Sequence, residues 1–491
     1  MAFTHGVRVV ENPTAARAAV QVETGLPVYV GTAPVNLGDV TSVNKPVLCS
    51  SLAEYVAKFG PVLDSDRWSD YTLMEAAKAH FTLYGVAPIV CINVLDPANV
   101  DHLNQLVTEP AVLDANGDAF VESYGSVTPL FGVIKSTVVV RYGGILRTLG
   151  TDYTVAFDDD GYLVISRKAG GAIPAAATIV VSCSYLDPSA IVADDIIGGY
   201  ADGAYTGLEV VEQVYPKLKK VPGFILAPGW TGEPTVAAAA TTKATLVNGA
   251  FRAMALTDLS SDPYEIATYA DVAAWKSDNG YTDENQIALW PKVKFGDDVY
   301  HLSTHVACIA NLTDQAHSNL PFASPSNKAI EALSMVLDDD TEVYLTEPQA
   351  TALNAQGIMT ARNTFGGWKT WGNQTGCYPT NTDVKDSFIP IRRMGNHLNN
   401  TLILTVESQV DEPGNRRLID GVVLTVGILL NSWIAVGAML PGSKCEFLSD
   451  DNPLADLLLG KYVFRITQAV PPPAQTIQFT VVYDTSLLVG I

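Results

Sequence analysis

Residues 221–229, VPGFILAPG, hold a short apolar run bounded by proline and glycine. Two further runs of this kind follow, FRAMALTDL (251–259) and NQIALWPKV (285–293), and a helix-like stretch separates each from the next. Continuous apolar runs between turn residues are typical of strands that are buried on both faces, as in parallel sheets. Strands that alternate with helices in this way predict a layered α/β fold.

The same alternation is present nearer the N-terminus. LPVYVGTAP (26–34) and APIVCINVLD (87–96) read as strands, and SLAEYVAKFG (51–60) and YTLMEAAKAHFTLYG (71–85) read as helices. Two more helices are expected in TGLEVVEQVYPKLKK (206–220) and YEIATYADVAAWKS (264–277). We therefore expect one α/β core built from residues 23–96 and 189–365.

Between these two parts, residues 97–188 change in character. They are rich in β-branched residues and turns, as in STVVVRYGG (136–144), TDYTVAFDDDGYLVISRK (151–168) and ATIVVSCSYLDP (177–188). This composition predicts an antiparallel β domain that is inserted into the core and faces outward. The Asp-Gly step in FDDDGYL predicts a hairpin turn, because a calcium loop would need further ligands and a closing glutamate.

Residues 366–470 form a third, α+β region. It contains VVLTVGILLNSWIAVGAML (422–440), which has no charge and is long enough to span a bilayer. Thr425, Asn431 and Ser432 lie within it, polar sequence flanks it, and no second such stretch occurs. We expect a buried or subunit-interface helix and no membrane insertion.

Both ends of the chain read as short strands on tethers. At the C-terminus, the alternating residues Ile477, Phe479, Val481 and Tyr483 follow Pro471–Pro473, a stiff extended spacer. No turn signal follows them, so we expect no hairpin partner downstream. At the N-terminus, GVRVVE is strand-like, with the apolar side chains of Val7, Val9 and Val10. We expect a terminal arm over residues 1–22 and another over 471–491. With the core, the insert and the third region, the predicted fold class is multidomain, α/β and α+β.

Composition excludes several classes of partner. Thirty basic and 52 acidic residues give a net charge of −22, which argues against binding nucleic acid or an anionic membrane. Six cysteines lie scattered without a CxxC pair, as expected of buried free thiols in a reducing compartment. The N-terminus has no apolar signal-peptide core, so synthesis and folding in a cytoplasm are expected.

No sequence motif indicates chemistry. His301 and His305 in HLSTH have the spacing of two zinc ligands, but Leu302 stands where a zinc protease needs its glutamate. GGYADGAYTG (198–207) lacks the Gly-Lys-Ser/Thr of a phosphate loop, and Gly-x-Ser-x-Gly does not occur. We expect no catalytic residue, no metal and no cofactor. Two alternatives remain: a degenerate hydrolase, and another self-assembling or adhesive surface protein.

An ordered set of motifs in the second half resembles a known family. The set comprises FASPSN (322–327), LNAQGIMTARN (353–363), GGWKTWGNQT (366–375), FIPIRRM (388–394), LPGSKCEFLSDDNPLADLLLGKYVFRI (440–466) and PPPAQTIQFTVVYDTSLL (471–488). Together with HGVRVVE (5–11), it looks like the contractile tail sheath proteins of bacteriophages and related contractile injection systems. The marker is Trp368, Trp371, Gly372 and Asn373. One departure is the 422–440 helix, which is more apolar than its equivalents.

This resemblance implies a structural protein. The core would have some likeness to subtilisin-type folds without their catalytic motif, and the terminal arms would add strands to sheets of neighbouring subunits. The subunits would stack as rings, which we expect to be hexameric, around a tail tube, and the sheath would contract to drive that tube through a cell envelope. Partners would be other copies of the chain, the tail tube protein, and baseplate and tail terminator proteins. The location would be the virion tail, assembled in the bacterial host cytoplasm.

Overall fold

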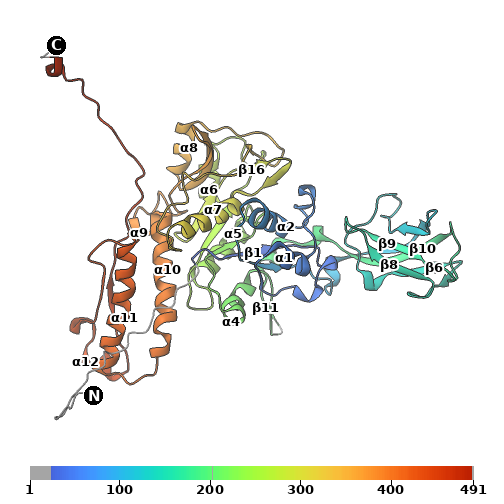
Figure 1. Ribbon diagram of the computed structural model, residues 1–491, viewed down its shortest axis with the longest axis horizontal. Coiled ribbons are helices and arrows are strands. Elements are labelled where there is room, and N and C mark those ends of the chain that lie inside the picture. The colour runs from blue at the N-terminus through green and yellow to red at the C-terminus, as the bar shows by residue number, and fades with distance from the viewer. Residues whose placement is uncertain (1–23, 202, 489–491) are drawn as a thin grey trace, which may run out of the picture.

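The computed structural model describes residues 24–201 and 203–488. The chain is elongated, with the α/β core in the middle, the β insert at one end and the C-terminal helices at the other (Figure 1). The predicted arm residues Val7, Val9 and Val10 lie outside the described residues.

The core is built on a sheet of eight strands in the order β2-β3-β1-β13-β14-β15-β19-β20. Neighbouring strands from β3 to β19 pair in parallel, for example Val28 with Val90 and with Ile225, and the edge strands β2 and β20 pair antiparallel. Every residue of β1, β3, β13, β14 and β15 is buried, as the apolar runs predict for strands covered on both faces. The strands span Pro27–Gly31 (β1), Val47–Cys49 (β2), Ile89–Asn93 (β3), Phe224–Leu226 (β13), Met254–Asp258 (β14), Gln286–Leu289 (β15), Ile358–Thr364 (β19) and Gly367–Trp371 (β20).

Helices cover both faces of this sheet. They are α1 (Leu52–Phe59), α2 (Leu73–Ala77), α3 (Ala193–Ile197), α4 (Val214–Leu218), α5 (Pro234–Thr245), α6 (Val272–Asp278), α7 (Leu302–Ala316) and α8 (Glu347–Asn354). A small antiparallel sheet joins β17 (Asp298–Tyr300), β16 (Lys292–Phe295) and β18 (Ser334–Val336), and β11 (Tyr200–Ala201) pairs with β12 (Ala204–Tyr205). The helix predicted from Tyr264 begins only at Val272, because Asp262 and Asp271 accept hydrogen bonds from backbone N–H groups of the preceding turns.

The inserted region forms two antiparallel sheets with a hydrophobic core of their own, which includes Val140, Ile165 and Ile179. One sheet has the order β4-β10-β6-β7 and the other β5-β9-β8. The Asp-Gly turn joins β8 to β9, so the predicted hairpin is confirmed. The strands span Leu103–Val112 (β4), Asp118–Phe120 (β5), Val139–Tyr142 (β6), Ile145–Leu146 (β7), Tyr153–Phe157 (β8), Leu163–Arg167 (β9) and Thr178–Leu186 (β10).

A seam of aromatic and cationic side chains fixes the insert against the core. The Arg67 guanidinium lies 4.6 Å from the centre of the Phe131 ring and donates a hydrogen bond to the Tyr162 hydroxyl (2.8 Å). Phe131 also meets Tyr71 edge to face, with ring centres 5.6 Å apart. The insert is therefore held by more than its two chain connections.

The C-terminal region is a helical hairpin beside a two-stranded sheet. Its elements are α9 (Val384–Ser387), α10 (Ile389–Val406), α11 (Arg416–Ala435), β21 (Lys444–Glu446), α12 (Leu454–Leu458) and β22 (Arg465–Thr467). The domain boundary expected at residue 366 is wrong by several residues. It falls inside the β19–β20 hairpin, where Ala361 pairs with Thr370, so β20 belongs to the core sheet.

Helix α11 carries most of the long apolar stretch. It begins at Arg416, because Asn415 caps it, and ends at Ala435, because Gly437 takes a positive φ of 79°. One face packs on the rest of this region through Val426, Leu430 and other buried side chains. Within the described ranges it is the one helix long and apolar enough to cross a membrane, and a single helix of that kind is a weak indication of a span.

Candidate functional site

The C-terminal arm leaves the folded body as an extended chain (Figure 1). Its predicted strand residues are almost wholly in solvent: the exposed fractions are 71% for Ile477, 85% for Phe479, 91% for Val481 and 78% for Tyr483. Over the described part of the arm no residue joins a strand ladder. Four large apolar side chains on one exposed segment are an interaction surface without a partner in its own chain. The strand itself stays a prediction.

The arm begins beside a small sheet. In β21–β22, Cys445 pairs with Ile466, and the described residues put no third strand on either edge. The Val470 side chain is buried, and Leu440 N donates to Ala469 O (2.8 Å), so the body ends at the proline spacer. Open backbone edges are templates for added strands. This sheet was not predicted, because its only signals in the sequence are the short runs KCEF (444–447) and FRIT (464–467).

The marker motif lies where the core meets the C-terminal helices. Gly372 follows β20 and packs so closely that a Cβ would lie 2.9 Å from Met359 Cα. Asn373 Oδ1 accepts a hydrogen bond from the Ser324 hydroxyl, and Asn373 O accepts one from Ile389 N (2.9 Å) at the start of α10. The indole N–H of Trp368 donates to Leu333 O (3.0 Å). The Arg362 guanidinium stacks on the half-buried ring of Trp371, 3.9 Å from its centre. All four marker residues therefore contact other parts of their own chain.

A buried ion pair locks the C-terminal region to the core. The Arg393 guanidinium of α10 donates two hydrogen bonds to the Asp314 carboxylate of α7, at 3.1 and 2.5 Å. The side chains are only 3% and 2% exposed. Thr24, where the described chain begins, donates to the same carboxylate (2.9 Å). Removal of one partner would leave the other charge buried and unpaired.

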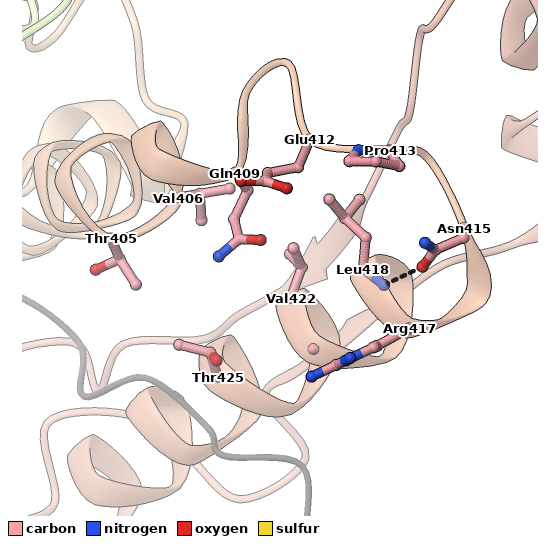
Figure 2. A pocket seen from close by; sticks show the side chains of 11 residues that line it. Thr405, Val406, Gln409, Glu412, Pro413, Asn415, Arg417, Leu418, Val422 and Thr425 are labelled. Atoms are coloured by element: carbon pink, nitrogen blue, oxygen red, sulfur yellow. Dashed lines mark hydrogen bonds between the residues drawn. The ribbon is translucent and has the colours of Figure 1, made fainter.

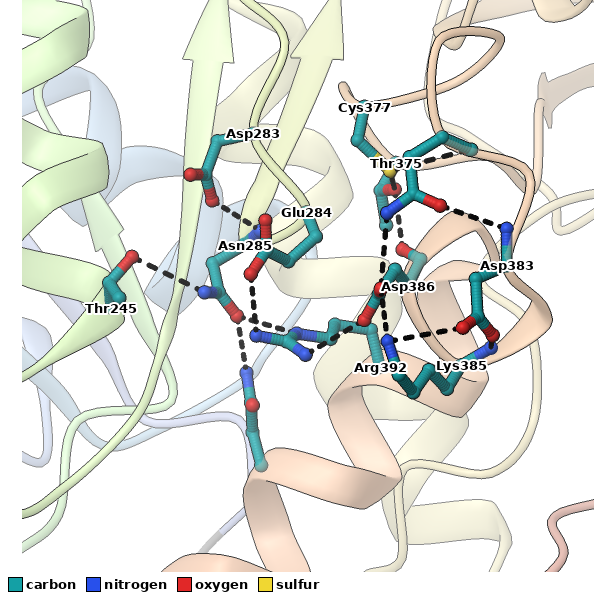
Figure 3. Close-up of polar contacts among 12 residues, drawn as sticks. Thr245, Asp283, Glu284, Asn285, Thr375, Cys377, Asp383, Lys385, Asp386 and Arg392 are labelled. Atoms are coloured by element: carbon teal, nitrogen blue, oxygen red, sulfur yellow. Dashed lines mark hydrogen bonds and ion pairs between the residues drawn. The ribbon is translucent and has the colours of Figure 1, made fainter.

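Figure 3 shows a second group of contacts across this junction. The Arg392 guanidinium donates to Asn285 Oδ1 (2.8 Å), Asp386 Oδ1 (3.1 Å) and Glu284 Oε1 (3.3 Å). The buried Lys276 ammonium donates to Gly376 O (2.7 Å) in the connecting segment. Core and C-terminal region therefore form one body.

The HLSTH histidines do not share a site. His301 precedes α7, and its Nδ1 lies 2.7 Å from Glu75 Oε2. His305 is fully buried, and its Nδ1 is hydrogen-bonded to the Tyr84 hydroxyl (2.7 Å). The Ser303 hydroxyl donates to Asp258 Oδ2 (2.5 Å) and not to a histidine. Among the described residues no group of three or more His, Cys, Asp or Glu could hold a metal ion. The arrangement caps the N-terminus of α7 with two buried carboxylates.

Three buried histidines make the fold sensitive to acid. Burial lowers the pKa of His80 to about 4, that of His305 to about 3 and that of His397 to about 4, so all three are neutral in the folded state. In the unfolded chain their pKa is about 6.5, so below that pH only the unfolded state takes up the protons. This stability is fully present above pH 6.5 and is lost as the pH falls towards 4.

We expect the free energy of unfolding to fall by about 2.5 kcal/mol per histidine between pH 7.5 and 4.5. Urea unfolding of the soluble chain at several pH values measures this. His305→Gln should reduce the pH dependence, because glutamine takes up no proton in either state. An unchanged free energy of unfolding between pH 7.5 and 4.5 would contradict the assignment.

The C-terminal region also carries exposed apolar surface. On α11, Leu424 and Ile428 are 45% and 52% exposed, and on α12, Leu454 and Leu458 are 72% and 77% exposed. Figure 2 shows a groove of about 360 Å³ between the end of α10 and the start of α11, lined by Val406, Leu418 and Val422 and also by Gln409, Glu412 and Arg417. Apolar and polar side chains are mixed in this lining, as they are in protein–protein interfaces.

The chain is similar to several known proteins. No protein-family model matches the chain. The tail sheath protein of Burkholderia phage BcepMu is 28% identical over 97% of this chain and 96% of its own length. The sheath of the extracellular contractile injection system PVC, in its contracted state, covers 99% of both chains with a TM-score of 0.59 at 13% identity. A chain of the contracted anti-feeding prophage baseplate covers 99% of this chain and 100% of its own, with a TM-score of 0.58 at 15% identity.

These solved structures share the fold, a mixed α/β multidomain architecture, and the phage relative shares the sequence along almost the whole length. The motifs in residues 322–488 carry the same resemblance. The chain is therefore a homologue of the contractile tail sheath proteins, which are structural subunits and not enzymes.

Proposed function

We propose that this chain polymerises as stacked hexameric rings around a tail tube, and that the sheath contracts to drive the tube through the target cell envelope. The observation that carries this proposal is that one subunit has both an exposed arm without a partner and a two-stranded sheet without a third strand. The arm of one copy would add a strand to β21–β22 of the next, which covers both the exposed edge and the exposed apolar side chains. The N-terminal arm, with Val7, Val9 and Val10, would act in the same way.

The rigid junction supports a contraction in which whole subunits reorient. Arg393, Arg392 and Lys276 hold the core and the C-terminal region together, whereas residues 474–486 of the arm are all exposed. Tethers of extended chain permit rotation without dissociation. The energy would be stored in the extended lattice, and no nucleotide is needed.

The remaining partners follow from the relatives. The solved neighbours include chains of sheath and baseplate assemblies, which supports baseplate association and a helical homopolymer for this chain. Tail tube and tail terminator proteins complete the proposed set, in a virion tail assembled in the host cytoplasm. The parallel order of the six central strands supports the expected likeness to subtilisin-type folds.

Electron microscopy of the overexpressed chain tests the proposal. We expect hollow tubes from the full chain. A soluble particle without any polymer would instead favour the degenerate hydrolase, and irregular aggregates or films would favour an adhesive surface protein.

The same assay tests whether residues 97–188 face outward. A variant in which a short Gly/Ser bridge replaces them should still form tubes, because the insert has its own hydrophobic core and its entry and exit lie together: His102 accepts hydrogen bonds from both Asp96 N (3.0 Å) and Asp187 N (2.9 Å). Arg67, Tyr71 and Phe131 form the seam that excision breaks, so Tyr71→Thr should accompany the excision to preserve solubility. An unfolded product in both backgrounds would contradict the domain assignment.

Tube binding is proposed for the inner wall near residues 422–461. We expect Lys461→Glu to reduce assembly on tubes by tenfold or more and to leave empty sheaths unaffected. The Lys461 side chain is 66% exposed, and its ammonium lies 3.5 Å from Asp456 of α12, the helix that carries the exposed Leu454 and Leu458. Lys135→Glu, on the insert, is the matched control. Equal co-assembly of both variants with purified tubes would place the inner wall elsewhere.

A further inference from the structure

A second, smaller pocket lies between α10, the end of α11 and the loop that follows α7. Its volume is about 140 Å³. The mouth is formed by the exposed residues Ser318, Asn319, Ser432 and Val436, and the floor by the buried residues Leu320, His397, Thr401 and Trp433. The pocket is therefore open to solvent at the surface and buried at its base.

Two polar atoms at the base have no hydrogen-bond partner among the described residues: Nδ1 of His397 and Oγ1 of Thr401. The two residues are 6% and 0% exposed, so bulk water does not serve either atom. The Trp433 ring lies against the His397 ring, with centres 5.3 Å apart. Buried polar groups in native proteins are nearly always paired, so two unpaired ones in one pocket indicate a missing partner.

The backbone at the mouth is also unusual. Ser318 and Asn319 follow one another with φ values of 63° and 55°. Two consecutive non-glycine residues in the left-handed region are uncommon, and such strained residues cluster at sites of binding. Asn319 N donates to Asp314 O (2.8 Å), which holds the strained loop on the end of α7.

Size and chemistry together select the class of ligand. A cavity of about 150 Å³ accommodates a benzene ring, so this pocket fits one six-membered ring. Leu320, Trp433 and Val436 offer it apolar walls, and the unpaired atoms of His397 and Thr401 call for one group that both donates and accepts a hydrogen bond. A phenol meets both requirements.

The exposed C-terminal arm carries such a group. Tyr483 is 78% exposed, and Phe479, on the same face, has no hydroxyl to offer. The pocket and the β21–β22 sheet belong to the same C-terminal region, where Cys445 of β21 and Trp433 are members of one buried cluster. An arm strand of eight residues covers about 26 Å and each acceptor strand only about 10 Å, so part of the arm would extend past the sheet.

We propose that this pocket receives the Tyr483 side chain of a second copy of the chain, with the phenol hydroxyl bonded to His397 Nδ1 and Thr401 Oγ1. This inference rests on the proposed arm exchange and adds a specific anchor to it. A tyrosine seated in a pocket would fix the register of an otherwise uniform strand contact.

A double-mutant cycle on the full chain tests the hydrogen bonds. We expect Tyr483→Phe and Thr401→Val each to raise the critical concentration for polymerisation about tenfold, and the double variant to raise it by clearly less than the product of the two. The control is Phe479→Leu, made in the wild-type chain and in the Thr401→Val variant. Its effect on the critical concentration should be the same in both. Additive effects of Tyr483→Phe and Thr401→Val would overturn the proposal.

A disulfide trap tests the location. Val436→Cys combined with Tyr483→Cys should give ladders of cross-linked subunits on oxidation, and neither single variant should, because the six native cysteines are buried. Polymers without cross-links would overturn the pocket assignment. Polymerisation of a chain that ends at Val470 would instead overturn arm exchange itself, so the two failures are distinguishable.

Discussion

A chain that ends at Val470 is expected to fold as a soluble monomer and to lose polymerisation entirely. The hydrophobic clusters of the described chain are complete before the proline spacer, and Val470 is the last buried residue within it, so we expect the arm to add little to the stability of its own subunit. Between subunits its contribution is large. Burial of Ile477, Phe479, Val481 and Tyr483 would supply about 1.5–3 kcal/mol each, and each backbone hydrogen bond about 1 kcal/mol net.

Many such arms act together in a stack, so weak pairwise contacts become a durable mesh through effective concentration. Phe479→Pro should nearly match the truncation, because proline removes a donor in mid-strand, and Phe479→Leu is the control that keeps the donor. Circular dichroism and unfolding report on the fold, and sedimentation with electron microscopy on assembly. Ordered sheaths from the truncated chain would contradict strand exchange. An unfolded product would show that the strand pairs within a sheet of its own subunit.

Arg393→Ala is expected to lower the free energy of unfolding by about 3–5 kcal/mol. The variant leaves the Asp314 carboxylate 2% exposed with no cation beside it, and it also removes the guanidinium that stacks on Phe224, 4.7 Å from the ring centre. Because the pair joins α7 to α10, the loss should appear as early release of the C-terminal helices during urea unfolding.

The matched control is Arg416→Ala, which breaks the pair with Asp420 on the surface of α11. Its side chains are 85% and 59% exposed, so the expected loss is below about 0.5 kcal/mol. Hydrogen exchange of α10 and α11 would separate local release from global unfolding. Equal effects of the two variants would show that the junction does not hold the C-terminal region.

The parts of the fold with a strong local signal could be predicted from the sequence. Buried parallel strands such as β1 and β13 consist of continuous apolar runs, and the β8–β9 turn has its Asp-Gly pair. Boundaries set by tertiary contacts could not. β20 reads like the start of a new region, yet it pairs with β19 through contacts that no local pattern encodes.

The candidate site divides in the same way. The arm could be predicted from its alternating apolar and polar residues and from the prolines before them. β21 and β22 could not, because each has only three residues and is too short to show a periodicity. Arg393 and Asp314 lie 79 residues apart, and only the folded chain shows that they meet. The pocket at His397 and Thr401 draws its residues from three segments, so nothing along the sequence marks it.

The separation of arm and acceptor on one subunit has a consequence for growth. Pro471–Pro473 stiffen the exit from the body, and the arm leads away from the body as an extended chain (Figure 1), so a subunit cannot readily pair its arm with its own sheet edge. A contact between two unlike patches does not close on itself in pairs, and between successive rings it propagates as an open stack. The two ends of the polymer are then chemically different. One end has arms without an acceptor sheet, and the other has sheet edges without an added strand. The length of the polymer is then set by the proteins that bind these two ends.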